Sequence, residues 1–433
     1  MKSNKYAIPF AIVTSLFFLW GFITVLVDSL IPRLKDVFEL TYFQAGLVQF
    51  AFFLAYLVLS IPAGNILSRI GYQKGIVIGL TTMTAACLLF YPAAGQRIFG
   101  LFMLAYFTLA GGITVLQVAA NPYVAALGEE SGAASRLNLA QAFNSFGTTL
   151  APIAGAAFLL SDTIKSQEEI NGLSEADQME YFIGEAAAVQ NPFLWLAGAI
   201  GVLAVFFLFI KLPKIISEST QGSYLEVLKN KVVLKGSFGI FLYVGAEVAI
   251  GSYLVNYFLD MNLVEPIRNS TFMNSIASIF TGSDLMEIDG KAVVGSFVFI
   301  YWGGAMLGRF VGSYLTRIFL PKKVLGSFAI FAITMIVLSM STSGLFSMLA
   351  ILFVGFFNSI MFPTIFTLTL EGQGDLKPRI SGLLCTAIFG GALISPAFGG
   401  LTDIVGFKFA FILPISCYGY IWWFSKMQST QTY

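Results

Sequence analysis

A short pattern occurs twice in this chain, 248 residues apart. It consists first of Gly64, Leu67, Arg69 and Lys74 and then, at the same spacing, of Gly312, Leu315, Arg317 and Lys322. Each copy lies in a short polar turn at the end of a long apolar run. A repeated cationic turn between apolar segments indicates that the chain consists of two homologous halves. Paired halves around a central site are a common construction of secondary transporters.

The composition indicates a membrane protein. Hydrophobic residues make up 57% of the chain and charged residues 11%, whereas soluble domains carry roughly 25% charged residues. The net charge of +1 gives no reason to expect a nucleic-acid partner, and the chain has no histidine to serve as a metal ligand or base. Three cysteines lie in apolar runs without metal-binding spacing, and we expect them to be small core residues: Cys87, Cys385 and Cys417.

Twelve segments are long and apolar enough to cross about 30 Å of hydrocarbon as helices. They lie near 7–31, 42–63, 74–94, 98–127, 136–160, 191–212, 237–259, 291–319, 323–343, 346–370, 379–402 and 406–425. The sequence therefore predicts an all-α membrane protein with two pseudo-symmetric six-helix halves, 1–212 and 237–433, and a polar cytoplasmic linker at 213–236.

Lysine and arginine predict the orientation of these spans. With the N-terminus inside, the inner segments hold 16 of the 24 Lys and Arg residues, and the outer loops hold 7. Because cytoplasmic loops carry the excess of these residues, we expect both termini in the cytoplasm.

Few ionisable residues lie inside the spans, where each costs about 2.5–3.5 kcal/mol on insertion scales. Asp28, in the outer half of the first span, is either a cation or proton site or an interfacial acid one turn before Pro32. Glu247, near the middle of the seventh span, is either such a site or part of a buried ion pair or hydrogen-bonded carboxyl. Arg309, towards the inner end of the eighth span, is expected to pair with an acid or with helix-end carbonyls.

Neutral amides inside the spans form the candidate ligand site. They are Gln117 and Asn121 in the fourth span, Asn138, Gln141 and Asn144 in the fifth, Asn256 in the seventh and Asn358 in the tenth. An amide that faces lipid leaves its donors unsatisfied, so we expect these side chains to point into the bundle. They either tie helices together or bind sugar hydroxyls, since each amide offers both donors and an acceptor.

The seventh span needs a break if both of its polar residues are to reach one cavity. Glu247 and Asn256 are nine residues apart, which is half a turn out of phase on a straight helix. We expect the helix to unwind at Gly251. Three aromatic residues offer flat faces for a sugar ring, or serve as packing and interface anchors: Trp20, Trp302 and Tyr253.

The two cationic turns are expected to act as conformational latches on the cytoplasmic side. Arg69 and Arg317 would pair there with acids or helix-end carbonyls, and we group Arg309 with them as a gating residue. The candidate acid partners are Glu129 and Glu130 for the first turn and Glu371 and Asp375 for the second. Such contacts would bias the exchange between outward and inward states.

The arrangement of spans and turns resembles the major facilitator superfamily. Twelve spans in two sets of six, a basic central loop and a Gly-x-x-Leu-x-Arg turn after the second and eighth spans carry this resemblance. The repeat also relates Asn121-Pro122 to Phe362-Pro363, Phe146-Gly147 to Phe389-Gly390, and Arg136 to Arg379.

Five segments carry a sharper resemblance. They are Val27-Asp28-Ser29-Leu30-Ile31-Pro32, Phe43-Gln44-Ala45-Gly46-Leu47, Ala119-Ala120-Asn121-Pro122, the stretch from Leu137 to Gly147, and Pro363-Thr364-Ile365-Phe366. They resemble the bacterial fucose permease family, the fucose–galactose–glucose:cation symporter branch of the superfamily. The resemblance implies a sugar importer driven by a cation gradient, with Asp28 at the position of the family's protonation site.

One position departs from the fucose permease pattern. The family's fourth-span glutamate, four residues before the Asn-Pro pair, is replaced here by Gln117. With Gly245-Ala246-Glu247 in the seventh span, this is more similar to the glucose/galactose transporter subgroup. Some relatives use sodium, and a carboxylate among amide and carbonyl oxygens suits a hard cation. Both H⁺ and Na⁺ therefore stay open, and Asp28 is the metal ligand if sodium is used.

The expected function is import of a hexose, glucose or galactose or a related sugar, by symport with a cation through alternating access. The alternatives are a fucose or amino-sugar permease of the same family, a proton-coupled exporter of small molecules and a passive facilitator. The sequence offers no nucleophile–base pair or metal cluster, so we expect no enzyme. We also expect no cofactor besides the co-transported ion, a monomer, and a place in the bilayer of the bacterial inner (cytoplasmic) membrane.

Overall fold

The structure is a computed structural model that describes residues 5–37, 42–96, 98–159, 172–214, 223–281, 286 and 288–427. Side chains at 27–37, 42–46, 153–159, 175, 182, 185–189 and 279–281 are outside the description. The long helices are α1 (Ala7–Val37), α2 (Tyr42–Ile70), α3 (Tyr72–Gly95), α4 (Phe99–Ala126), α5 (Ala133–Leu159), α7 (Glu175–Phe209), α9 (Lys231–Asp260), α13 (Val298–Ile318), α14 (Pro321–Ser341), α15 (Gly344–Asn358), α16 (Met361–Leu370), α17 (Lys377–Thr386), α18 (Gly390–Ala410) and α19 (Ile412–Met427). The shorter ones are α8 (Tyr224–Lys229), α10 (Val264–Asn269), α11 (Thr271–Thr281), α12 (Gly290–Gly295) and the 3₁₀ turns η1 (Glu130–Gly132), η2 (Gly374–Leu376) and η3 (Ala387–Phe389).

All described secondary structure is helical, as the sequence predicts. Ten stretches of the described chain are long and apolar enough to cross a membrane. They cover α1–α4, α7, α9 and α14, and three stretches in which consecutive helices share one span: α12 with α13, α15 with α16, and η2 and α17 with α18. Helices α5 and α19 lie where the remaining two of the twelve expected spans were placed.

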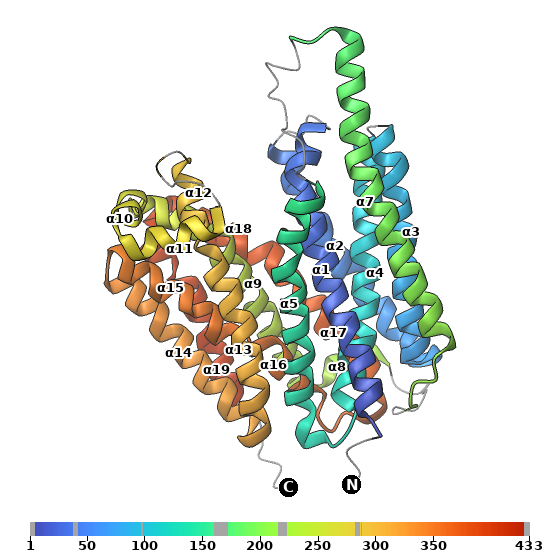
Figure 1. Ribbon diagram of the computed structural model, residues 1–433. Coiled ribbons are helices and arrows are strands. Elements are labelled where there is room, and N and C mark those ends of the chain that lie inside the picture. The colour runs from blue at the N-terminus through green and yellow to red at the C-terminus, as the bar shows by residue number, and fades with distance from the viewer. Residues whose placement is uncertain are drawn as a thin grey trace. The chain divides into compact units, whose positions relative to one another are not determined.

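The described chain forms two compact units (Figure 1). The first comprises residues 1–127, 146–227 and 372–386, and the second comprises 128–145, 228–371 and 387–433. The N-terminal part of α5 therefore packs within the second unit, and α17 packs within the first. The expected boundaries at 212 and 237 stay a prediction; α9 itself begins within the expected linker, at Lys231.

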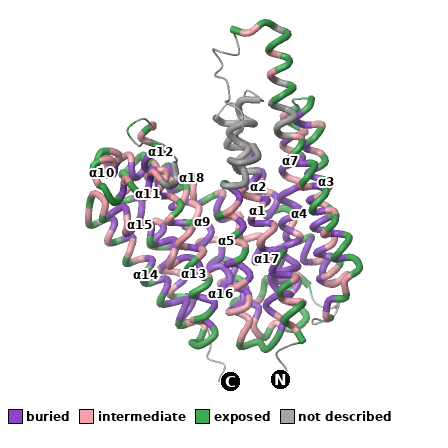
Figure 2. Tube along the Cα trace, in the orientation of Figure 1, coloured by how far each residue is buried: buried purple, intermediate pink, exposed green. Residues whose placement is uncertain are grey.

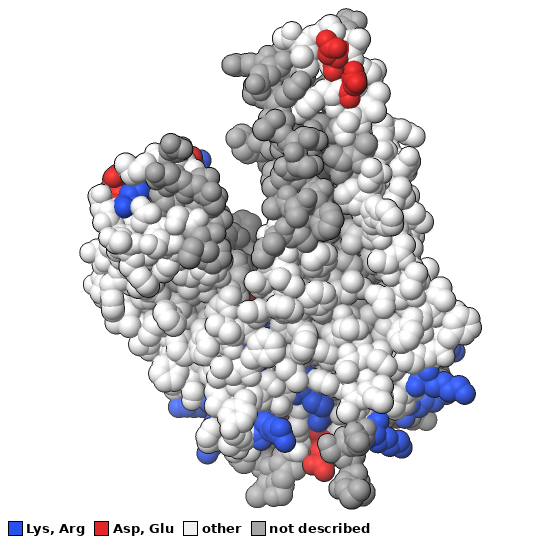
Figure 3. Space-filling model, in the orientation of Figure 1, with Lys and Arg blue, Asp and Glu red and all other residues white. Residues whose placement is uncertain are grey.

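Buried and exposed residues alternate along the helices in Figure 2, so most helices have one buried and one exposed face. The outward faces carry large apolar side chains such as Trp195, Val202 and Phe209, of which 71–79% is exposed. Most of the surface in Figure 3 carries no charge, and the Lys, Arg, Asp and Glu atoms visible there lie mainly near the top and the bottom of the view. An apolar surface of this extent is suited to contact with lipid hydrocarbon.

Two prolines, one in each half, each leave a backbone carbonyl without its usual hydrogen-bond donor. Proline has no backbone N–H, so the carbonyl four residues earlier in the helix lacks its usual donor. In α4, Pro122 leaves the carbonyl of Val118 in this state, and the Ser381 hydroxyl of α17 donates to it at 2.8 Å. The tenth span places Pro363 at the related position, four residues after Ser359. The span breaks there into α15 and α16, and a side chain from another helix again supplies the donor.

The two copies of the repeated turn end their helices differently. After Arg69 and Ile70, Gly71 adopts a positive φ of 83°, a conformation open to glycine, and α3 begins at the next residue. The second copy has no such glycine. There α13 ends at Ile318, and α14 starts with Pro321 in its first turn, where the missing N–H is not needed.

Candidate functional site

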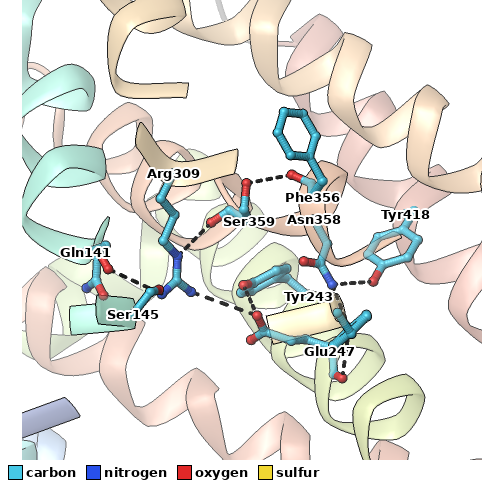
Figure 4. Close-up of polar contacts among 10 residues, drawn as sticks. Gln141, Ser145, Tyr243, Glu247, Arg309, Phe356, Asn358, Ser359 and Tyr418 are labelled. Carbon is cyan, nitrogen blue, oxygen red and sulfur yellow. Dashed lines mark hydrogen bonds and ion pairs between the residues drawn. The ribbon is translucent and has the colours of Figure 1, made fainter. Parts of the chain in front are cut away.

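A polar cluster lies inside the second unit and contains the two candidate charges Glu247 and Arg309. Helix α9 contributes Glu247, α13 contributes Arg309, and α5, α15 and α19 contribute uncharged partners (Figure 4). Both charged side chains are only 13% exposed. Charges held this far from water need partners, and the surrounding contacts provide them.

Among the described residues, two polar groups neighbour the Glu247 carboxylate. The hydroxyl of Tyr243, one turn earlier on α9, donates to Glu247 Oε1 at 2.7 Å. Arg309 Nη2 lies 3.9 Å from the same oxygen. A direct charge-assisted N–H···O bond measures about 2.7–2.9 Å, so the guanidinium attracts the carboxylate without contacting it.

Arg309 is held by three oxygens from two helical segments. Its Nε donates to the Ser359 carbonyl at 3.1 Å, which is the carbonyl that Pro363 leaves without a donor. Its Nη1 donates to the Ser145 hydroxyl and, at 3.4 Å, to the Gln141 carbonyl. We expected Arg309 to pair with an acid or with helix-end carbonyls, and its bond to the Ser359 carbonyl at the end of α15 matches the second alternative. The arginine thus connects α5 with the end of α15.

Three buried tyrosines complete the cluster, and the sequence reasoning did not select them. Asn358 Nδ2 donates to the hydroxyls of Tyr301 at 2.8 Å and Tyr418 at 3.3 Å, and the Tyr301 hydroxyl donates to the Glu247 carbonyl at 3.2 Å. Asn358 is fully buried, and its Oδ1 has no hydrogen-bond partner among the described residues. The spacing of four residues between Tyr243 and Glu247 was the available signal.

The amides of α5 have different surroundings. Gln141 and Ser145 are buried beside Arg309, and Asn144 is half-buried. Asn138 is fully buried, and its Nδ2 donates to the Ala134 carbonyl and to the Thr364 hydroxyl of α16. Its geometry favours the alternative that this residue ties helices together.

The fourth-span amides belong to the first unit. Gln117 Nε2 donates to the Tyr56 hydroxyl of α2 at 2.7 Å and is half-buried. Asn121 is fully buried next to the thiol of Cys385 on α17. Asp28 lies on α1, but its side chain is outside the described part of the chain.

The expected break in the seventh span is wrong. Helix α9 continues from Lys231 to Asp260, through Gly251. A Cβ at Gly251 would lie 2.7 Å from the Trp302 ring, so this glycine makes room for an aromatic side chain rather than unwinding the helix. Asn256, half a turn away from Glu247, is exposed and outside the cluster.

The three proposed stacking residues also lie in packed surroundings. The Trp20 ring is buried against Phe17 of its own helix. Trp302 stands edge-on to Tyr301 and is 42% exposed, and Tyr253 packs against Phe398. The burial of Trp20 favours a packing role for that residue, and both alternatives stay open for Trp302 and Tyr253.

The repeated turns do not hold the ion pairs that we expected. Arg69 and Arg317 are exposed, and within the described chain neither makes a hydrogen bond or ion pair. Their side chains extend from the last turn of a helix towards solvent. Instead, Arg136 donates to the Glu129 carbonyl at 2.8 Å, and the related Arg379 is 4% exposed. The repeat between these two arginines, visible in the sequence, was the better signal.

Comparison with known proteins identifies relatives along almost the whole chain. Residues 10–396 match the family model described as Major Facilitator Superfamily. A Brucella abortus protein named glucose/galactose transporter is 43% identical over 426 residues, which are 97% of this chain and 94% of that one. The L-fucose-proton symporter of Escherichia coli is 32% identical over 442 residues, 99% of this chain and 94% of that one.

A solved structure matches equally well. The crystal structure of the major facilitator superfamily transporter FucP in the outward conformation covers 98% of this chain and 100% of its own, with a TM-score of 0.86 at 31% identity. Together with the family match, this confirms the predicted twelve-span major facilitator fold.

Proposed function

Because the chain belongs to the major facilitator superfamily, and within it to the glucose/galactose subgroup of the fucose permease-like family, we propose that it imports a hexose by symport with a cation. The chain is a membrane transporter and not an enzyme. Glucose, galactose or a related sugar is the substrate. The similarity to a protein named glucose/galactose transporter, along 97% of the chain, is the observation that carries this proposal.

The coupling ion, H⁺ or Na⁺, is assigned to Asp28 and Glu247. Asp28 stands in a membrane span, where a carboxyl is expensive unless it has a role. Glu247 supports the assignment by its surroundings: one tyrosine hydroxyl at 2.7 Å and one guanidinium at 3.9 Å leave the carboxylate free to exchange a cation. No further cofactor enters the proposal.

The sugar is assigned to the amides of the spans. Gln117, Gln141 and Asn144 are the first candidates, because Gln117 and Asn144 are half-buried and Gln141 lies beside Arg309 with 6% of its surface exposed. Asn121, Asn138, Asn256 and Asn358 stay predicted members of the site; the complete burial of three of them and the exposure of Asn256 make them weaker candidates. An L-fucose permease remains the second candidate function, since the E. coli fucose symporter is 32% identical.

The same relatives and the distribution of Lys and Arg support a membrane location and an orientation for the protein. We place the chain as a monomer in the inner membrane of a bacterium, with both termini in the cytoplasm. The excess of Lys and Arg in the segments on the side of the termini supports this orientation. On this assignment Arg69, Arg317 and Arg309 act in gating.

Uptake by proteoliposomes tests the proposal. Radiolabelled glucose, galactose and fucose are offered with a pH gradient or a sodium gradient, each imposed separately. We expect accumulation of glucose or galactose above equilibrium with one of the two gradients. Preference for fucose selects the second candidate, and equilibration without accumulation would exclude symport.

The Asp28→Asn variant tests the coupling assignment. It should lose uphill accumulation and retain exchange of sugar, because binding persists when the ion site is lost. Asp403→Asn is the matched control, since Asp403 is an exposed acid near the end of a span. Full accumulation by Asp28→Asn would remove that residue from the mechanism.

A further inference from the structure

Arg309 lies between the Glu247 carboxylate and helix α5. Its Nε is fixed at the Ser359 carbonyl, where Pro363 removes the competing backbone donor. Its two remaining nitrogens point in different directions, Nη1 to Gln141 and Ser145 on α5 and Nη2 towards Glu247. The guanidinium therefore has one anchor and two competing sets of acceptors (Figure 4).

We propose that Arg309 is a positioning residue that couples the charge of Glu247 to the attachment of α5 to α13. The inference rests on the proposed cation symport and adds how one carboxylate governs a helix contact. Ser313, a little more than one turn after Arg309 on α13, also contacts α5: its hydroxyl lies 3.3 Å from the Ser135 hydroxyl and donates to the Ser135 carbonyl at 2.9 Å.

The direction of the coupling follows from the geometry. An ionised Glu247 attracts the guanidinium away from α5, and the 3.9 Å separation leaves room for that movement. A neutral Glu247 removes the attraction, so that the oxygens of α5 keep the guanidinium. Neutralisation of Glu247 thus strengthens the attachment of α5, and ionisation weakens it.

The coupling between the charge of Glu247 and the attachment of α5 acts in both directions. If the charge of Glu247 alters the attachment of α5, detachment of α5 must alter the charge of Glu247 to the same extent. When α5 leaves α13, Arg309 loses the Ser145 hydroxyl and the Gln141 carbonyl and turns to Glu247. The carboxylate is then stabilised as the anion, and a proton carried on Glu247 leaves as that face of the transporter opens.

Among the described groups that face Glu247, Arg309 is the one whose charge is attracted by the charge of Glu247. Described neighbouring elements present few titratable side chains: α16 has none, and those of α18, Asp403 and Lys408, are exposed. The groups that face the carboxyl are Tyr243 of α9, Arg309 and Tyr301 of α13, and Tyr418 of α19, with the neutral Asn358 of α15. Arg309 is the cation among them.

A disulfide between Ser135→Cys and Ser313→Cys measures the attachment, because the two hydroxyls are 3.3 Å apart. The three native cysteines, all buried, are replaced by serine. The rate of oxidative cross-linking is followed from about pH 5 to about pH 9, a range that includes the values recorded for buried carboxyls. At each pH the rate is divided by the rate at which free cysteine is oxidised, because deprotonation of the thiols itself accelerates disulfide formation at alkaline pH. The cross-linking rate compared between variants is this normalised rate. No sugar is added, so the result does not depend on whether hexose is transported.

With Glu247 and Arg309 intact, we expect cross-linking to be roughly fivefold or more faster at the acid end, the lower limit of ordinary coupling between sites. Glu247→Gln should give the fast rate at every pH. Arg309→Gln should abolish the pH dependence, and Arg309→Lys, which keeps the charge but loses the forked geometry, should reduce it. Arg268→Gln is the matched control, since Arg268 pairs with the exposed Glu265, and it should retain the full response.

Two results would overturn the inference. One is a normal pH response in Glu247→Gln or in either Arg309 variant that elutes as a folded monomer. The other is a response that disappears with Asp28→Asn alone. If the protein accumulates hexose but its cross-linking rate does not depend on pH, this inference is wrong and the proposed function is retained. The reverse outcome, pH-dependent cross-linking without hexose transport, rejects the substrate alone.

Discussion

Replacement of Gly382 by alanine should shift the conformational equilibrium of the transporter. Helix α17 carries Gly382 within the first unit, where it approaches Gly64 of α2. An added Cβ would lie 2.6 Å from the Ser60 carbonyl oxygen, 2.8 Å from the Tyr224 hydroxyl and 3.2 Å from the Gly64 Cα. Two of these three atoms are backbone and cannot rotate away. The substitution therefore acts on the contact between α2 and α17.

The magnitude follows from these distances. Ordinary contacts lie at 3.4–4 Å, so the helices must separate by about 0.8 Å at this point to restore one. Overpacking of this kind costs about 1–3 kcal/mol. A state in which α17 has left α2 does not bear that cost, and the equilibrium should shift towards it by about 5- to 150-fold.

The native thiol of Cys385 reports the opening. It lies three residues from Gly382 on the same helix and is fully buried. With Cys87→Ser and Cys417→Ser as background, a maleimide should label Cys385 faster in Gly382→Ala by the factor given above. Uptake should become slower, because the closed state on this face is less populated.

Two matched variants separate this effect from loss of stability. A Cβ at Gly355 would contact the Tyr301 backbone between α15 and α13, so Gly355→Ala should lower thermal stability without exposing Cys385. A Cβ at Gly400 meets nothing within 4 Å, so Gly400→Ala should change neither quantity. An unaltered labelling rate in Gly382→Ala, at normal expression, would show that the α2–α17 contact does not govern opening.

Three further outcomes are expected. Gln141→Ala should weaken hexose binding several-fold to ~100-fold in an equilibrium assay, because an unpaired buried sugar hydroxyl costs about 1–3 kcal/mol; unaltered affinity would favour a packing role. Tyr224→Phe removes a 2.7 Å hydrogen bond to an α2 carbonyl and should lower stability by about 0.5–1.5 kcal/mol in thermal melts. Tyr224→Leu also removes the ring, and a larger loss of stability would show that the ring contributes by packing. Ser381→Ala leaves the Val118 carbonyl without its donor and should cost about 1–3 kcal/mol; a melting temperature equal to that of the parent would show that another group replaces it.

The sequence predicted the number of spans and the nature of the fold because both depend on long apolar runs and on the repeat. It also selected Glu247 and Arg309, since a charge in an apolar span is conspicuous. It did not predict that these two residues share a cluster, because they are 62 positions apart in the chain and only packing brings them together. The break expected at Gly251 failed for a similar reason, since the Trp302 ring that fills the space belongs to another helix.

The cationic turns show a different limit. Arg69 and Arg317 are conspicuous as a repeated motif, yet both are exposed in this structure. A repeat records that two positions serve the same purpose and does not state in which conformation they serve it. Latch contacts that form only in another state would leave these arginines exposed in the present one, so their gating role stays a prediction.

The two prolines suggest why a charged side chain satisfies the free carbonyl in one half and a neutral side chain satisfies it in the other. Each proline leaves a carbonyl without a donor, at Val118 in one half and at Ser359 in the other. The first is satisfied by the neutral hydroxyl of Ser381, the second by the charged Arg309. A hydroxyl needs no counter-ion, whereas a buried guanidinium does, and Glu247 is the acid within reach. The carbonyl that proline leaves without a donor is therefore bound by a neutral group in one half and by a charged group in the other. A proton or cation on Glu247 can control only the second contact.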